Sequence, residues 1–161
     1  MDASLIILNY KTAGLVRQCL KSIVAAAPKL EYEIIVVDND SRDGIEAMLA
    51  EQFPNVRFIP SGRNAGFAAG NNIGLGAASG RYAMIVNPDI LVTPGSLEEM
   101  VKEMDAHPEI GLLAPQLLNP DKTIQYSCYR FPTFGIPFYR RTPLGRTPRG
   151  KRLLRAYLMA E

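Results

Sequence analysis

The chain has 161 residues, of which 47% are apolar and 21% charged, the size and composition of one globular domain with a sizeable core. No apolar run approaches the roughly 20 residues that a membrane-spanning helix needs, and "MDASLIILNY" lacks the basic leader of a signal peptide. We therefore expect a cytoplasmic protein. The net charge of +2 conceals an asymmetry, because residues 1–125 carry 10 basic and 15 acidic side chains, whereas residues 126–161 carry 8 and 1.

The first three quarters of the chain alternate between continuous apolar runs and segments with helical periodicity. Apolar runs predict strands at residues 4–10, 32–38, 55–61, 81–87 and 110–118. Apolar side chains that recur every three or four residues predict helices at 12–27, 41–53, 66–80 and 93–108. Thr12 and Ser41 are the expected N-caps of the first two helices. The order favours an α/β fold with a doubly wound, mainly parallel sheet and helices on both faces.

The end of the chain follows a different pattern. "IQYSCYRF" (124–131) follows the turn "NPDKT" and can return as a hairpin partner. Residues 132–161 are rich in proline, glycine and arginine, and we interpret them as an extended basic arm that ends in a short helix. The sequence therefore predicts a domain over residues 1–131 and an arm over residues 132–161.

Polar residues collect where the predicted strands end. Parallel sheets bind ligands at the carboxyl ends of their strands, and these ends carry Asn9-Tyr10, "DNDS" (38–41), "SGRNAGFAAGNN" (61–72) and "NPD" (87–89). Each ending also has a purely structural interpretation: a capped turn, a helix entrance whose glycines allow close packing, or a β-turn. Their coincidence at one sheet edge favours a ligand site.

Several other chemistries are poorly supported by the sequence. No G-x-G-x-x-G follows the first strand and no G-x-x-x-x-G-K-[ST] occurs, which argues against dinucleotide-binding and P-loop sites. His107 is the single histidine, so histidine-dependent triads and multi-histidine metal sites are excluded. Cys19 and Cys128 lack metal-ligand spacing, and Cys19 is expected to be a buried thiol.

Four stretches together resemble family 2 glycosyltransferases of the GT-A fold. They are "SLIILNYKTAGLVRQCLKSI", "EIIVVDNDSRDG", "RNAGFAAGNNIGLGAASGRYAMIVNPDILVTPGSL" and "LLNPDKTIQYSCYRFPT". The resemblance covers residues 3–158 and is closest to the rhamnosyltransferase-like enzymes of bacterial polysaccharide assembly. Residues 1–131 would then be the nucleotide-sugar-binding domain.

The resemblance also implies roles for individual residues. Asp38 would contact the nucleotide base, and the polar residues after it would hold the nucleoside. Asn64 and Gly66 would line the nucleotide-sugar pocket, and Asp89 would bind Mg²⁺ or Mn²⁺ together with the donor diphosphate. Asn87 stands where the family usually has the first aspartate of D-x-D. With the end of the first strand included, the expected nucleotide-sugar-binding residues are Asn9, Tyr10, Asp38, Asn39, Asp40, Asn64, Gly66, Asn71, Asn87 and Asp89.

The implied reaction is inverting transfer of a sugar, with rhamnose as one candidate, from a dTDP- or UDP-sugar to a polysaccharide or lipid-linked glycan. The family's general base lies downstream of D-x-D, and no acidic residue after Asp89 matches it. We therefore expect a truncated, donor-binding part of such an enzyme, with the catalytic residue unassigned. The alternatives are a non-catalytic nucleotide-binding module of the same fold and an unrelated α/β domain that binds nucleic acid.

The basic arm has several interpretations of its own. It can be a solvated segment, a peripheral contact with the anionic inner face of the membrane, or a nucleic-acid-binding segment, which is the least favoured because no nucleic-acid module accompanies it. "LLRAYLM" (153–159) can also drive self-association into a homo-oligomer.

Overall fold

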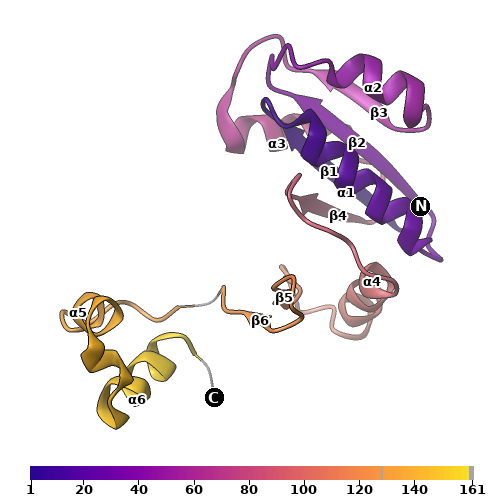
Figure 1. Cartoon of the computed structure of the whole chain (residues 1–161). Helices are drawn as coiled ribbons and strands as arrows, with labels where there is room; N and C mark the ends of the chain where they lie inside the picture. The colour runs from indigo at the N-terminus through magenta and orange to yellow at the C-terminus, as the bar shows by residue number, and fades with distance from the viewer. Residues whose placement is uncertain (128, 160–161) are drawn as a thin grey trace. The chain divides into compact units, whose positions relative to one another are not determined.

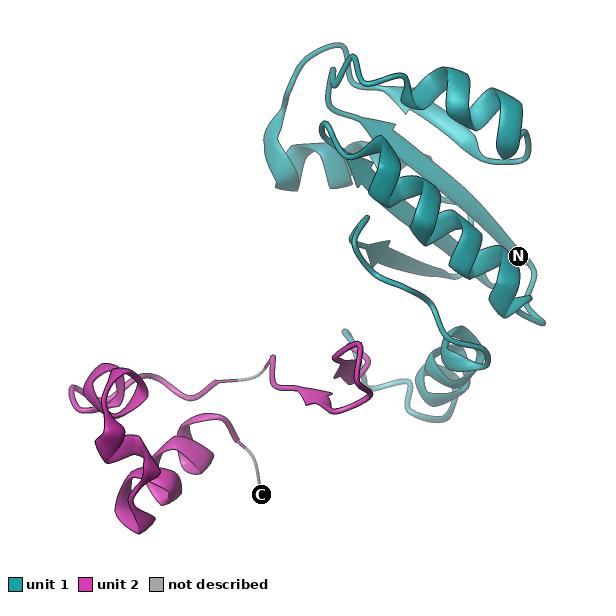
Figure 2. Ribbon diagram, viewed as in Figure 1, with its two compact units in different colours: residues 1–113 teal, residues 114–161 magenta. Residues whose placement is uncertain are grey.

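The structure is a computed structural model that describes residues 1–127 and 129–159 (Figure 1). It divides into two compact units, Met1–Leu113 and Ala114–Glu161, called unit 1 and unit 2 below (Figure 2). The composition boundary between residues 131 and 132 falls inside unit 2, because the hairpin that precedes it belongs with the basic segment. Cys128 lies outside the described residues. None of the described helices has the length and apolar content to cross a membrane.

Unit 1 is built on a four-stranded sheet in which every pairing is parallel (Figure 1). Its strands, in the spatial order β3-β2-β1-β4, are β3 (Arg57–Pro60), β2 (Tyr32–Asp38), β1 (Ala3–Asn9) and β4 (Tyr82–Val86). The register pairs Asn9 with Asp38 and Asp38 with Pro60. The polar residues that end β1 and β2 are therefore neighbours at one edge of the sheet.

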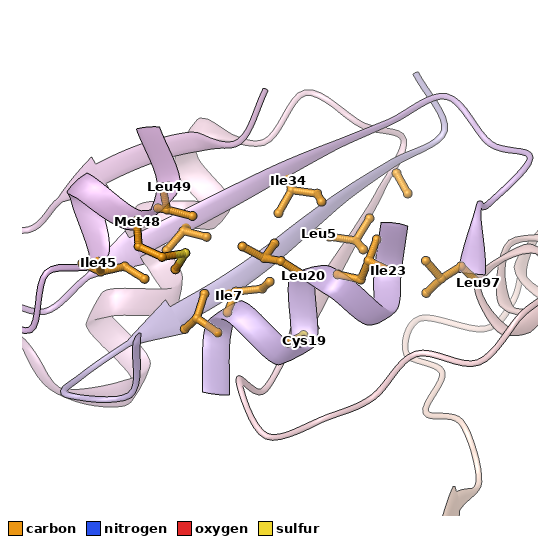
Figure 3. Packing of buried hydrophobic residues seen from close by; sticks show 13 residues of the cluster. Leu5, Ile7, Cys19, Leu20, Ile23, Ile34, Ile45, Met48, Leu49 and Leu97 are labelled. Carbon is orange, nitrogen blue, oxygen red and sulfur yellow. The ribbon is translucent and has the colours of Figure 1, made fainter. Parts of the chain in front are cut away.

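Helices cover both faces of this sheet, as the sequence predicts. They are α1 (Ala13–Ala26), α2 (Ile45–Gln52), α3 (Gly66–Ala77) and α4 (Ser96–Ala106). The larger core packs α1 and α2, together with Leu97 of α4, against the face of β1 and β2 that carries Leu5, Ile7 and Ile34 (Figure 3). A smaller cluster packs Ile73 of α3 against the opposite face. Burial on both faces explains why β1 and β2 are continuous apolar runs.

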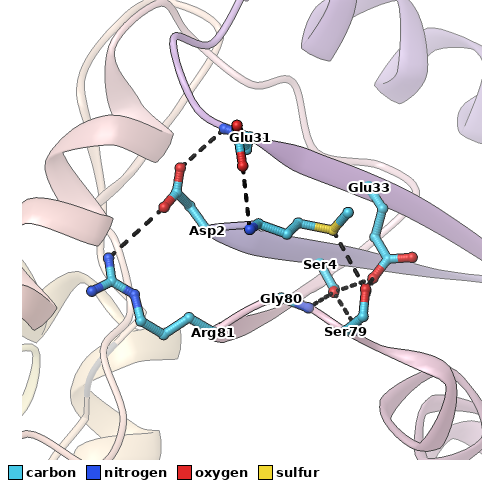
Figure 4. Close-up of polar contacts among 8 residues, drawn as sticks. Asp2, Ser4, Glu31, Glu33, Ser79, Gly80 and Arg81 are labelled. Atoms are coloured by element: carbon cyan, nitrogen blue, oxygen red, sulfur yellow. Dashed lines mark hydrogen bonds and ion pairs between the residues drawn. The ribbon is translucent and has the colours of Figure 1, made fainter.

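The amino-terminal edge of the sheet is held together by its own polar side chains (Figure 4). Glu33 accepts hydrogen bonds from Ser4 Oγ at 2.7 Å and Ser79 Oγ at 2.6 Å. The Ser4 hydroxyl also accepts from the Gly80 N–H at 2.8 Å. These bonds satisfy the polar groups of the connection from α3 to β4. We therefore assign this edge of the sheet a role in stability.

The predicted fifth strand of the sheet is wrong. Residues 110–118 contribute only β5 (Leu117–Leu118), which pairs antiparallel with β6 (Ile124–Gln125) in a separate ribbon of unit 2. Gly111 and Pro115 interrupt the apolar run, and proline lacks the N–H that a sheet ladder requires. The return of the chain as a hairpin partner is confirmed.

The expected extended arm is wrong for residues 136–146, which form two helices, whereas the expected short helix at its end is present. Unit 2 contains α5 (Ile136–Arg141), the 3₁₀ helix η1 (Pro143–Arg146) and α6 (Pro148–Tyr157). The prolines occupy the first turns of these helices, where a missing N–H costs nothing. Thr147 caps α6 by accepting a hydrogen bond from the Gly150 N–H at 3.1 Å. The prolines thus start helices within the segment that we interpreted as an extended arm.

Candidate functional site

A buried polar network joins the carboxyl ends of β1 and β2. The Asn9 side-chain nitrogen donates to Asp38 Oδ1 at 2.8 Å, to Ser41 Oγ at 3.0 Å and to Asp43 Oδ2 at 3.1 Å. Asn9 is fully buried and Asp38 is only 7% exposed. Two carboxylates and a hydroxyl therefore converge on one amide, which fixes the orientation of Asp38 at the edge of the sheet.

The same network caps α1. Asn9 Oδ1 accepts from the Thr12 N–H at 3.1 Å and from Thr12 Oγ1 at 2.9 Å, and Asp43 Oδ2 accepts from the Ala13 N–H at 3.0 Å. The first N–H groups of a helix have no intrahelical partner, and here side chains from β1 and from the loop after β2 supply one. Thr12 makes no side-chain cap of its own, because its hydroxyl is turned to Asn9.

The loop after β2 is held in an unusual backbone conformation. Asp40 and Arg42 have φ values of 56° and 54°, in the left-handed region, which costs about 1–2 kcal/mol for an ordinary side chain. Asp38 Oδ2 accepts from the Ser41 N–H at 3.1 Å, and Ser41 Oγ accepts from the Lys11 N–H at 2.9 Å. Ser41 therefore fastens this loop to β1. The prediction that it caps α2 is wrong, since Gly44 occupies that position.

The entrance to α3 is tied to the end of β2 through Asn39. The Asn39 side-chain nitrogen donates to the Gly66 carbonyl oxygen at 3.1 Å, and Asn64 Oδ1 accepts from the Gly66 N–H at 3.0 Å. Gly66 has a φ of 82°, which suits glycine. Asn71, buried on α3, donates to the Phe67 carbonyl oxygen at 2.9 Å.

Two amide oxygens in this region lack a hydrogen-bond donor. Asn39 Oδ1 and Asn71 Oδ1 are buried and have no partner among the described residues. A buried polar group without a partner costs about 1–3 kcal/mol, so native proteins retain few of them. Both belong to residues that the sequence places in the ligand site.

The "NPD" turn forms a separate, exposed part of the candidate site. The Ile90 N–H donates to the Asn87 carbonyl oxygen at 3.2 Å, which makes this segment a β-turn, and both Asn87 and Asp89 are exposed. The Val92 N–H then donates to Ser22 Oγ of α1 at 2.9 Å. The chain after β4 therefore runs along α1.

The Asp38 side chain lies on the face of the sheet that α1 covers. Asp38 follows Ile34 and Val36 with the strand period of two, and both belong to the core that α1 covers. Burial, and secondarily the Asp89 carboxylate, raises the pKa of the Cys19 thiol of α1 to about 11. Among the described residues, no hydrogen bond or ion pair joins Asn87 or Asp89 to the Asn9 network.

Two of the expected site residues have exposed side chains beside this network. Tyr10 is 44% exposed, with the Lys11 ammonium 5.4 Å from its ring centroid. Asp40 is exposed, and its carboxylate lies 3.4 Å from Arg42 Nε. Neither side chain belongs to the buried network, and both are accessible to a ligand.

Sequence reasoning missed Asp43, which is half-buried and contacts both Asn9 and the start of α1. Asp43 also accepts from the nearby Ile45 N–H at 3.3 Å, but its partners Asn9 and Ala13 lie 30 or more residues away in sequence. The pattern "SRDG" resembles an ordinary helix start, so only the pairing of β1 with β2 reveals its role.

The exposed groups of the "NPD" turn fit a divalent cation shared with a substrate. Within residues 1–127 and 129–159, no group of three or more histidine, cysteine, aspartate or glutamate side chains could hold a metal by itself. Asp89 offers one carboxylate and Asn87 one amide oxygen, and both are hard oxygen ligands. Mg²⁺ is usually bound by one or two carboxylates plus substrate phosphates and water, and this donor set fits that arrangement.

Comparison of the sequence with known proteins finds a family model and relatives that are named for glycan biosynthesis. The sequence model described as Glycosyl transferase family 2 matches residues 4–157. A relative named N-acetylglucosaminyl-diphospho-decaprenol L-rhamnosyltransferase, from Mycobacterium tuberculosis, is 27% identical over 149 residues, which are 81% of this chain and 48% of that protein. Succinoglycan biosynthesis protein ExoO of Rhizobium meliloti is 32% identical over 65% of this chain and 30% of its own length.

Solved structures match the fold. TarS 1–349 of Staphylococcus aureus superposes with a TM-score of 0.60 at 23% identity and covers 67% of this chain and 33% of that one. The mannosyltransferase PcManGT of Pyrobaculum calidifontis, solved with GDP-Man and Mn²⁺, gives a TM-score of 0.57 at 27% identity over 63% of this chain and 32% of its own. The chain spans about half or less of each of these proteins.

Proposed function

The chain belongs to glycosyltransferase family 2, and from this premise we propose that it binds a nucleotide-diphosphate sugar at the carboxyl edge of its sheet. The whole reaction would be inverting transfer of that sugar to a polysaccharide or lipid-linked glycan. Rhamnose, carried by dTDP, is the sugar we favour, because a rhamnosyltransferase is among the relatives and aligns with 81% of the chain. A UDP-sugar is the second candidate.

The observation that carries this proposal is the fixed position of the Asp38 carboxylate at the carboxyl end of β2. Asn9 and the Ser41 N–H hold the Asp38 carboxylate, which only accepts hydrogen bonds. Uracil and thymine rings each present an N–H donor that such a carboxylate can accept. Asn39 and Asp40 would meet the nucleoside, while Tyr10, Asn64, Gly66 and Asn71 would line the remaining pocket.

Asp89 would hold the cation, with Asn87 as a neutral oxygen ligand or as a contact to bound water. When bound, Mg²⁺ or Mn²⁺ supplies Lewis-acid stabilisation of the negative charge that grows on the diphosphate leaving group. Both residues are exposed at a turn, so a donor diphosphate can approach them. The carboxylate and the cation together would orient the diphosphate for departure.

We further propose that the protein works at the cytoplasmic face of the membrane, where unit 2 makes a peripheral contact. Residues 114–161 contain nine lysines and arginines and two acidic residues. Such segments are attracted to anionic lipid surfaces. The name of the Mycobacterium tuberculosis relative describes a decaprenol-linked acceptor, which would reside in a membrane.

Calorimetric titration of UDP, dTDP and GDP, with and without Mn²⁺, tests the binding site. We expect metal-dependent binding that Asp89→Ala weakens about tenfold or more, as the loss of a charged ligand predicts. Glu51→Ala removes an equally exposed carboxylate from α2 and should leave the affinity unchanged. Failure of the folded protein to bind any of the three nucleotides would refute the proposal.

A turnover assay separates this function from the alternative of a non-catalytic nucleotide-binding module. Both bind the nucleotide diphosphate, but only a transferase moves the sugar to an acceptor. Release of dTDP or UDP that depends on a lipid-linked glycan would exclude the module.

A further inference from the structure

Unit 2 contains a cavity that the nucleotide site does not use. The helices α5, η1 and α6 border an open pocket of about 490 Å³, lined by Arg140, Arg141, Arg146, Thr142 and Leu154 among others. The lining is therefore cationic on one part and apolar on another. A cavity of this size holds a small anionic group with part of the molecule attached to it.

The three arginines of this cavity lack a protein anion. In the part of the chain that the structure describes, none of them forms an ion pair or donates a side-chain hydrogen bond. The described acid of unit 2, Asp121, is engaged within its own turn by the Thr123 N–H at 3.0 Å and Thr123 Oγ1 at 2.6 Å. Arginines that line one pocket without a protein counter-charge favour a bound anion.

A further donor lies in the same lining. Thr142 Oγ1 is buried and has no hydrogen-bond partner among the described residues. A hydroxyl and several guanidinium groups are the donors that phosphate oxygens accept, and arginine binds phosphate through two parallel hydrogen bonds. The cavity thus has the donor chemistry of a phosphate site.

Close backbone packing gives the cavity a defined shape. A Cβ atom on Gly145 would overlap the Tyr139 carbonyl oxygen, and one on Gly150 would overlap the Leu144 carbonyl oxygen. Only glycine allows α5, η1 and α6 to approach so closely. The backbone positions of the arginines are therefore set by the fold of unit 2.

Phenylalanine side chains are exposed on the same unit. Phe131 is 99% exposed, Phe134 106% and Phe138, on α5 itself, 57%. Removing such a ring from water would be favourable by about 25 cal/mol for each Å² of apolar surface that becomes buried. Such rings enter the interfacial layer of a membrane. They also stack on unpaired bases, so the comparison with RNA below is needed to separate the two partners.

We propose that unit 2 binds the surface of an anionic membrane: Arg140, Arg141, Arg146 and Thr142 hold the phosphate of a phospholipid headgroup, and the exposed phenylalanines enter the interfacial layer. Cationic side chains beside aromatic rings are the combination that binds bilayer interfaces. The inference rests on the membrane location proposed above and is independent of nucleotide binding.

Vesicle co-sedimentation of the full chain tests the proposal. We expect binding to phosphatidylcholine vesicles that contain phosphatidylglycerol and none to phosphatidylcholine alone. The variant Arg140→Gln/Arg141→Gln/Arg146→Gln should bind at least about tenfold more weakly. The control Arg149→Gln/Lys151→Gln/Arg155→Gln removes the same charge from exposed positions of α6 outside this lining and should lose less than about threefold.

Other outcomes overturn the proposal. Equal losses in the two triple variants would mean attraction by net charge without a phosphate site. Competition by millimolar inorganic phosphate that abolishes vesicle binding would indicate a free-anion site, and tighter binding to RNA than to vesicles would indicate a nucleic-acid surface.

A second variant keeps the test valid should the triple variant unfold, which circular dichroism would reveal. Phe131→Ser/Phe134→Ser changes two fully exposed rings and should weaken vesicle binding while leaving nucleotide affinity intact. Unchanged vesicle binding in this variant would contradict the insertion of these rings. Nucleotide titration of the same samples separates failure of this site from failure of the donor site.

Discussion

Units 1 and 2 differ in where they keep their apolar side chains and their charge. Among the described residues, the buried apolar side chains belong to unit 1 with the single exception of Ile136. Unit 2 exposes several large apolar side chains and carries nine basic residues. Unit 1 therefore has a core that positions the candidate site, whereas unit 2 presents apolar and cationic side chains at its surface.

The largest effect expected from this difference is on stability. Ile35→Ala removes a fully buried side chain from β2, and we expect a loss of about 2–5 kcal/mol in the free energy of unfolding. Phe134→Ala removes a larger but exposed side chain from unit 2 and should change it by less than about 0.5 kcal/mol. Urea unfolding followed by circular dichroism measures the stability of both variants. Comparable losses in the two would contradict the difference between the units.

The Asn9 network should contribute less than the core but more than a surface contact. Asp43→Ala removes an acceptor from Asn9 and leaves the Ala13 N–H uncapped, which should cost about 1–2 kcal/mol. Asp40→Asn, in the same loop but exposed, should cost almost nothing. The same urea titration distinguishes them, and a stability of Asp43→Ala equal to that of the wild type would show that the network is not needed.

The amino-terminal edge of the sheet should make unit 1 sensitive to acid. Hydrogen bonds from Ser79, then from Ser4, lower the pKa of Glu33 below its ordinary value of 4.5. Because the folded state favours the ionised form, this stabilisation is present above pH 4.5 and is lost as the pH falls through the lowered pKa. Glu33→Gln should make the free energy of unfolding less dependent on pH below pH 4.5. An unchanged pH dependence in this variant would contradict the prediction.

The smallest expected effect concerns the position of Asp89. Its carboxylate adds to burial in raising the pKa of Cys19, so Asp89→Asn should lower the thiol pKa while burial keeps it above its ordinary value. The pH dependence of thiol alkylation, in a Cys128→Ser background, measures this shift. An unchanged pKa would place Asp89 away from α1.

The features of unit 1 that depend on local pattern could be predicted from the sequence. β2 begins and ends where its apolar run does, and the neighbouring ends of β1 and β2 follow from the register of a parallel sheet. The role of Asp43 in the Asn9 network could not be predicted, because it depends on contacts with β1 and α1. The short helix at the end of unit 2 was predicted, but α5 and η1 were not, because their prolines lie in the first turns, where proline is tolerated.

The central claim is that Asp38 and Asp89 serve one site that holds a cation and a nucleotide diphosphate. Paramagnetic broadening of backbone amide signals by Mn²⁺ tests it most directly. We predict that, only when UDP or dTDP is also present, the amides of Asn39, Gly66 and Asp89 broaden together, and that Asp89→Ala abolishes the effect. Broadening confined to the acidic first turn of α4, or identical with and without nucleotide, would contradict the account.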